Sequence, residues 1–272
     1  TEIYTLSLHD ALPICFHRFF GEVYPGQTMP DHTMSIEEFF VLLRKMKVWC
    51  CSLESCFLPE NKQRVLTAVK EYPGKVTFAW GHPHGFMDTD ETSSREEIVQ
   101  YLEMSRLIGA SVLRIAGSSI EYFNRPHEPQ IKRVVQRIRK LIPCVEEYGV
   151  KLALENHGDF SCAEIERILE EFDSKHVGTV LDTGNALRMG EDPRENIEIL
   201  KDRVLMVHAK DLRPLDGFPG NDPRGFSCVP AGEGITDFPA IFDALTEVGF
   251  SGYILVERSE ERRVGKECRS RW

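Results

Sequence analysis

The feature that most constrains the fold is a regular alternation of helical stretches with short apolar strands, which starts near Ser35 and continues to residue 256. This alternation is typical of strand–helix units repeated around a parallel sheet. No linker or low-complexity stretch interrupts it. We therefore expect one α/β domain. The predicted strands cover residues 48–53, 76–80, 112–116, 152–154, 177–181, 204–207 and 253–256.

Local signals mark where the helices begin and end. Ser35 is followed three residues later by Glu38, which is the pattern of a capping box at a helix N-terminus. Gly109, Gly149 and Gly249 each follow a helical stretch and precede a strand, where a left-handed residue commonly ends a helix. These glycines are expected to set the turns from helix to strand.

The strand count and the chain length together predict a closed barrel. Seven strands can be recognised, and the N-terminal region offers the place of an eighth. A (β/α)8 TIM barrel typically needs about 250 residues, which a chain of 272 residues provides. The contents of 42% hydrophobic and 28% charged residues are ordinary for a globular domain. We predict a single-domain (β/α)8 TIM barrel over residues 15–258.

The two ends of the chain look foreign to this barrel. Residues 1–14 (TEIYTLSLHDALPI) and 259–272 (SEERRVGKECRSRW) resemble translated sequencing-adapter sequence. We expect both segments to lie outside the catalytic domain and to damage its first strand and last helix; a native pair of unusual termini is the alternative. Residues 3–8 are rich in β-branched and aromatic side chains and could still fill the place of the first strand.

Composition narrows the classes of partner. No apolar run approaches the roughly 20 residues that span a bilayer, so a membrane partner is not expected. A net charge of -10 gives no general attraction to nucleic acid. The eight cysteines form no C-x-x-C pair, and we interpret them, including the adjacent Cys50 and Cys51, as reduced thiols of a cytoplasmic protein. We expect a small-molecule substrate, and a homo-oligomer remains open.

Polar side chains follow the predicted strands at their C-terminal ends. In a barrel these ends converge on one face, where barrel enzymes bind their substrates. Carboxylates crowded on that face repel one another unless protons or a cation neutralise them. Four residues of metal-ligand type recur at the ends of the last four strands, and we predict that they bind one divalent metal ion: Glu155, Asp182, His208 and Glu257.

Three carboxylates and one imidazole form a mostly oxygen donor set. Such a set suits Mn²⁺, Mg²⁺ or Co²⁺ better than structural zinc sites, although Zn²⁺ is also compatible. Mn²⁺ is our first expectation. Weaker signals predict contacts with the substrate from His157, Lys210, Arg114, Glu54, His82, His84 and His17.

For several of these residues a structural role is an equal alternative. His157 could cap its loop, Arg114 could be an ion-pair partner, and Lys210 could either neutralise an oxyanion or pair with Asp211. The glycines around Glu233 either allow a ligand to approach the backbone or form a simple turn.

Five sequence runs carry a resemblance to a known family. They are LALENHGDF around Glu155, TVLDTGNAL around Asp182, LMVHAKDL around His208, PAGEGITDF around Glu233, and YILVE ending at Glu257. In order and spacing they resemble the sugar isomerase/epimerase family of xylose-isomerase-like TIM barrels, over nearly all of residues 15–258. The resemblance implies that the same four residues are the metal ligands. It also implies that the two glutamates serve as catalytic acid and base.

The expected chemistry is proton transfer next to a carbonyl group. A metal that holds a ketose through its carbonyl and adjacent hydroxyl oxygens acidifies the neighbouring C–H by stabilising an enediolate. If Glu155 and Glu257 lie on opposite sides, one removes the proton and the other returns one to the opposite face, which is epimerisation. Return to the neighbouring carbon gives isomerisation. Loss of a β-hydroxyl group gives dehydration, so a sugar lyase or dehydratase on the same barrel is the alternative.

Two further classes are weaker alternatives. Abasic-site endonucleases share a similar barrel but use three zinc ions and additional histidines. Here the third residue after Asp182 is Asn185 rather than histidine, no Asp-x-His sequence follows His208, and the chain is acidic. A non-catalytic barrel that binds a partner is the other alternative.

Overall fold

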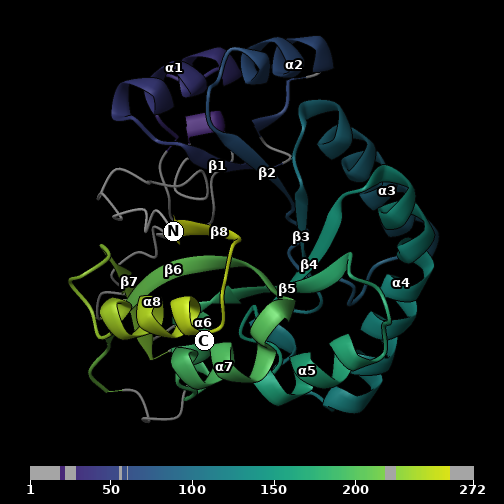
Figure 1. Cartoon of the computed structure of the whole chain (residues 1–272), viewed down its shortest axis with the longest axis vertical. Helices are drawn as coiled ribbons and strands as arrows, with labels where there is room; N and C mark the ends of the chain where they lie inside the picture. The colour runs from purple at the N-terminus through teal and green to yellow at the C-terminus, as the bar shows by residue number, and fades with distance from the viewer. Residues whose placement is uncertain (1–18, 22–28, 55–56, 60, 218–224, 258–272) are drawn as a thin grey trace.

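The computed structural model describes residues 19–21, 29–54, 57–59, 61–217 and 225–257. Its strands form a parallel sheet that is nearly closed into a barrel, with the helices arranged around it (Figure 1). The strands are β1 (Cys50–Leu53), β2 (Lys75–Trp80), β3 (Val112–Ala116), β4 (Lys151–Glu155), β5 (Val177–Asp182), β6 (Val204–Pro214), β7 (Phe226–Val229) and β8 (Tyr253–Glu257). The helices are α1 (Ile36–Met46), α2 (Lys62–Lys70), α3 (Glu91–Ile108), α4 (His127–Tyr148), α5 (Cys162–Glu170), α6 (Thr183–Arg188), α7 (Pro193–Leu200) and α8 (Phe238–Glu247), with short 3₁₀ turns η3 (Ile120–Tyr122) and η4 (Lys201–Arg203).

The strand order confirms the predicted barrel class. Strands β1 to β6 pair in chain order as parallel neighbours, and β8 pairs with β6, also in parallel. Strands β1 and β8 approach each other across the remaining gap, where the described part of the chain forms no ladder. The predicted place of the first strand and the two adapter-like segments lie outside the described residues.

Strand β6 is longer than predicted. Its second half, from Asp211 to Pro214, pairs antiparallel with β7, a strand that the sequence did not predict. Residues 211–214 read DLRP and carry no apolar run, so pairing with β7 rather than local pattern makes this segment a strand.

The helix ends largely follow the predicted signals. Ser35 and Glu38 form the expected capping box at the start of α1. Gly109 and Gly149 are left-handed C-caps of α3 and α4. Gly249, with φ of 69°, directly follows the C-cap Val248 of α8. The glycines therefore end three helices with a backbone conformation that other residues adopt at a cost.

Two further observations concern the classes of partner. None of the helices in the described ranges combines the length and apolar character required to cross a bilayer. Five cysteines of those ranges form no disulfide bond: Cys50, Cys51, Cys144, Cys162 and Cys228.

A small apolar cluster inside the barrel supports the face on which the polar residues lie. It is separate from the main core between strands and helices and includes Val112, Ala153, Val180, Met206 and Leu255. Each of these lies two residues before a polar residue of the same strand, and residues two apart share one face. The polar residues that continue the cluster toward the C-terminal ends are Arg114, Glu155, Asp182, His208 and Glu257.

A β-bulge brings two of these polar residues into register. Thr179 pairs with Val204 but Val180 pairs with Met206, so Leu205 is an extra residue on β6. Beyond the bulge, Asp182 lies opposite His208. Uninterrupted pairing would have placed Asp182 opposite Val207, whose side chain points to the other face of the sheet.

Candidate metal centre

The structure brings the four predicted ligands together. Glu155, Asp182, His208 and Glu257 are all buried, and one potential ligand atom from each lies within 4.8 Å of the others. They come from the C-terminal ends of β4, β5 and β8 and from the middle of β6. The barrel therefore concentrates three carboxylates and one imidazole at one point.

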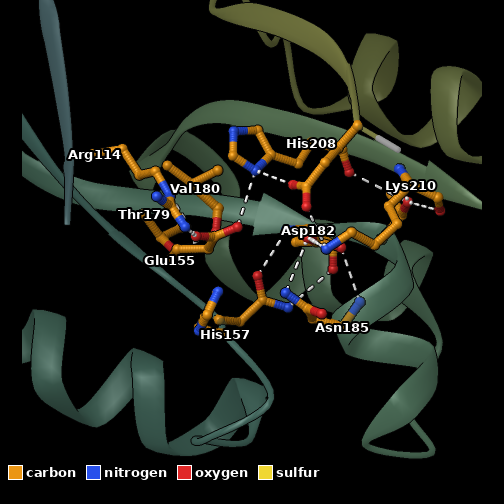
Figure 2. Close-up of polar contacts among 12 residues, drawn as sticks. Arg114, Glu155, His157, Thr179, Val180, Asp182, Asn185, His208 and Lys210 are labelled. Carbon is orange, nitrogen blue, oxygen red and sulfur yellow. Dashed lines mark hydrogen bonds and ion pairs between the residues drawn. The ribbon is translucent and has the colours of Figure 1, made fainter. Parts of the chain in front are cut away.

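Asp182 is fixed by two asparagines that the sequence analysis did not select. It is the N-cap of α6, where it accepts hydrogen bonds from the backbone N and side-chain Nδ2 of Asn185 at 2.8 and 2.9 Å (Figure 2). Asn156 bonds its backbone N and O at 2.7 and 3.0 Å. An Asp followed three residues later by Asn is compatible with an N-cap, and this was the available signal.

Glu155 is held by Arg114. The guanidinium Nε donates to Oε2 at 2.5 Å, and Nη2 makes an ion pair with the same oxygen. Burial raises the pKa of Glu155, but the charges of Arg114 and His208 outweigh it and hold this pKa well below its usual range. Arg114 is therefore an ion-pair partner, one of its two predicted roles, and its partner is a candidate metal ligand.

The ring of His208 lies between the two glutamates. Its Nδ1 is 2.9 Å from Oε1 of Glu155 and 2.9 Å from Oε2 of Glu257. Burial lowers the pKa of His208, but the neighbouring carboxylates raise it to about 9. One N–H group can donate to only one of these oxygens, and Oε2 of Glu257 has no hydrogen-bond partner among the described residues.

Lys210 pairs with two candidate ligands and not with Asp211. Its Nζ lies 2.7 Å from Oδ2 of Asp182 and 2.6 Å from Oε1 of Glu257. Burial raises the pKa of Glu257, but Lys210 and His208 hold it well below its usual range. Burial raises the pKa of Asp182 to about 6 despite the charge of Lys210. Each of the three carboxylates is therefore paired with a permanent cation, Lys210 serving two of them.

These residues fit a divalent metal ion. Four donors at about 2.1 Å from one ion lie within about 4.2 Å of each other, so the spacing requires adjustments below an ångström. The donor set is rich in oxygen, and Oε2 of Glu257 is a buried acceptor with no hydrogen-bond partner in the described part of the protein. Both observations are expected of residues that share a cation.

The other predicted site residues divide into two groups. His157 follows β4, interacts electrostatically with Glu155 and Lys210, and lies beside them in Figure 2. Burial lowers its pKa to about 4, and its Nδ1 has no hydrogen-bond partner within the described ranges. Glu54 follows β1 and interacts electrostatically with Arg114. These residues therefore lie around the candidate metal centre.

The described contacts of His82 and His84 are with residues outside the candidate metal centre, and His17 lies outside the described residues. The ring of His82 stacks on Trp80 at 5.4 Å, and the Trp80 indole donates to Glu97 of α3. His84 lies 3.5 Å from Glu121 in the next loop. A contact of any of these three histidines with a substrate stays a prediction.

Asp211 holds the loop around Glu233. Its carboxylate accepts hydrogen bonds from the backbone N of Leu212, Gly232, Gly234 and Thr236 at 2.8 to 3.0 Å. A Cβ atom on Gly234 would lie 2.2 Å from Oδ1 of Asp211. The predicted glycine loop is therefore a turn packed against β6.

Comparisons with known proteins agree with this fold. The profile of the xylose isomerase-like TIM barrel family matches residues 33–271. An inosose dehydratase of Lacticaseibacillus casei is 26% identical over 211 residues, which are 69% of this chain and 70% of that protein. The chain belongs to the xylose isomerase-like TIM barrel family, as the sequence runs indicated.

Solved structures show the same fold at low identity. A D-tagatose 3-epimerase-like protein has a TM-score of 0.69 and 19% identity, covering 82% of this chain and 87% of that one. The IOLI protein with a bound zinc atom has a TM-score of 0.69 and 23% identity, covering 84% and 86%. At these identities, the two structures support the shared fold alone.

Proposed function

We propose that this protein is a divalent-metal-dependent enzyme that removes the proton next to the carbonyl group of a polyhydroxylated ketone. The observation that carries the proposal is the convergence of Glu155, Asp182, His208 and Glu257, all buried, within 4.8 Å. Mn²⁺ is the proposed ion, since the donor set is rich in oxygen.

The two glutamates are the proposed proton-transfer groups. A bound divalent ion would polarise the substrate carbonyl and stabilise the negative charge that develops on its oxygen. Glu155 and Glu257 approach His208 with one oxygen each, while Arg114 and Lys210 hold the other oxygens. Each carboxylate is thus fixed in direction, which favours proton transfer at one defined atom. His157 is the proposed hydrogen-bond partner of a substrate hydroxyl group.

Dehydration is the first proposed outcome. Its support is the inosose dehydratase relative, whose sequence matches 70% of its own length to this chain. An inosose is a cyclic polyhydroxylated ketone, and loss of its α-proton followed by departure of a β-hydroxyl group releases water. The substrate class is therefore a cyclic polyhydroxylated ketone.

Epimerisation is the second candidate, and the placement of the glutamates favours it. Oε1 of Glu155 and Oε2 of Glu257 each lie 2.9 Å from Nδ1 of His208, so two carboxylates flank one point. A proton removed by one glutamate can be replaced from the other, which inverts the carbon.

Product analysis in D₂O separates these outcomes. The protein with added Mn²⁺ is incubated with an inosose and with free ketoses, and products are followed by NMR and mass spectrometry. Dehydration gives a product lighter by one water, whereas epimerisation gives an isomer that carries one solvent deuteron. Unchanged substrates without deuterium would contradict the proposed chemistry.

Two substitutions separate metal binding from proton transfer. Asp182→Asn is expected chiefly to weaken ion affinity, so excess Mn²⁺ should restore part of the activity. Glu257→Gln removes a proposed acid or base, so turnover should fall by roughly 10²-fold or more even at saturating Mn²⁺. Glu233→Gln, at an exposed loop carboxylate, is the matched control. Normal turnover of Glu257→Gln would make Glu257 only a ligand.

A further inference from the structure

The backbone of Lys210 is held from two sides by threonine hydroxyl groups. Oγ1 of Thr183 accepts from the Lys210 N at 3.0 Å and lies 2.7 Å from its carbonyl oxygen, to which it donates. Oγ1 of Thr236 donates to the same carbonyl at 3.2 Å. Thr236 in turn belongs to the loop that Asp211 fixes. The position of Lys210 is therefore set by α6, β6 and the loop before α8.

The stem of Lys210 is also confined. A Cβ atom built on Gly184 would lie 2.7 Å from both Cγ and Cδ of Lys210, closer than any normal contact. Only glycine at position 184 leaves room for the lysine stem along α6. The side chain is 7% exposed, and its head is directed at Asp182, as Figure 2 shows.

The ammonium group bridges two carboxylates that are candidate metal ligands. Nζ is 2.7 Å from Asp182 and 2.6 Å from Glu257, which uses two of its three N–H donors. An ion bound by these carboxylates at about 2.1 Å would lie within about 5 Å of Nζ. Positive charges at that distance in a buried site repel each other strongly. The same lysine therefore aligns the ligands and opposes the ion.

We propose that Lys210 is a positioning residue that holds Asp182 and Glu257 together and weakens the binding of the divalent ion. Its ammonium group supplies part of the positive charge that a bound ion would otherwise supply. The carboxylates therefore keep their arrangement without the ion, and a bound ion can still exchange. This inference rests on the proposed metal centre. It assigns to Lys210 a role toward the ligands that is independent of any substrate.

The test is a titration of Mn²⁺ into chelator-treated full-length protein, without substrate, by calorimetry. Lys210→Met keeps most of the stem but removes the charge. It should bind Mn²⁺ at least about ten-fold more tightly than the wild type, because the repulsion is lost. Its ion-free form should melt at a lower temperature, since two carboxylates then face each other uncompensated. Lys210→Arg, which keeps the positive charge, should bind Mn²⁺ more weakly than Lys210→Met.

A second variant moves the lysine without removing it. Gly184→Ala should displace the stem and shift Mn²⁺ affinity in the same direction as Lys210→Met, by a smaller factor. Gly81→Ala is the matched control, because a Cβ atom there would lie 3.5 Å from Glu54, an ordinary contact. It should leave the affinity unchanged. If Lys210→Met does not fold, Gly184→Ala decides the outcome.

The possible failures are distinguishable. If the wild type binds no divalent ion, the metal centre itself is wrong and the role of Lys210 falls with it. If the wild type binds Mn²⁺ but Lys210→Met binds it equally or more weakly, the metal centre stands and the proposed role of Lys210 is overturned.

Discussion

The carboxylate of Asp211 joins the loop around Glu233 to β6 by accepting hydrogen bonds from the backbone N–H groups of Gly232, Gly234 and Thr236. Gly234 lies against it so closely that no side chain fits, since a Cβ atom would be 2.2 Å from Oδ1. Gly234→Ala should therefore break this arrangement and lower the free energy of unfolding by roughly 2–4 kcal/mol. Urea denaturation followed by circular dichroism measures the change.

Gly249→Ala is the control for that experiment. Gly249 has φ of 69° but open space around its Cα, so alanine should cost only about 1–2 kcal/mol through backbone strain. Gly234 has no positive φ, so an unchanged stability of Gly234→Ala would show that the packing against Asp211 contributes nothing.

At the level of elements, His127 ties the start of α4 to α5. Its Nδ1 lies 2.8 Å from Glu164 Oε1 and its Nε2 lies 2.8 Å from the carbonyl oxygen of Phe123. Both neighbours are acceptors, so both ring nitrogens carry hydrogen when the two bonds form. Burial lowers the pKa of His127, but Phe123 and Glu164 outweigh it and raise this pKa above 6.5.

The sign of the resulting pH dependence follows from the raised pKa. The charged ring stabilises the folded protein fully below the unfolded pKa of about 6.5, and this contribution is lost as pH rises through the folded pKa. The free energy of unfolding should thus fall, as the pH rises above about 6.5, more in the wild type than in His127→Gln. The variant should lose roughly 1 kcal/mol at about pH 6. His32→Gln, at an exposed histidine, is the control, and parallel pH profiles of wild type and His127→Gln would contradict the prediction.

The elements also show what sequence can and cannot predict. Glu155, Asp182 and Glu257 follow apolar runs directly, so their meeting at one face follows from the parallel barrel. Strand β7 has no such run and forms because β6 lies beside it. The stacking of His82 on Trp80 is a contact in the loop after β2, where strand periodicity no longer predicts the direction of a side chain.

At the scale of the whole molecule, the candidate ligands join four neighbouring strands, β4, β5, β6 and β8, so ion binding should stabilise the folded barrel. At an ion concentration of about 100 times Kd, the gain is about 2.7 kcal/mol. For a domain of this size, that corresponds to a rise in Tm of roughly 5–10 °C. Differential scanning calorimetry with Mn²⁺ and with chelator measures it. Asp182→Asn should show a smaller rise, and an equal rise would place the ion elsewhere.

The β-bulge at Leu205 makes the assembly of this site depend on the register between β5 and β6. If β6 slipped by one residue against β5, Val207 and Ala209 would point into the barrel, and His208 and Lys210 would point toward the helices. The slipped barrel would still direct apolar side chains, those of Val207 and Ala209, toward its interior. However, no imidazole would then be in place to bind an ion, and no ammonium group would pair with the carboxylates. The polar centre is therefore complete only in the barrel in which β6 pairs with β5 in the observed register.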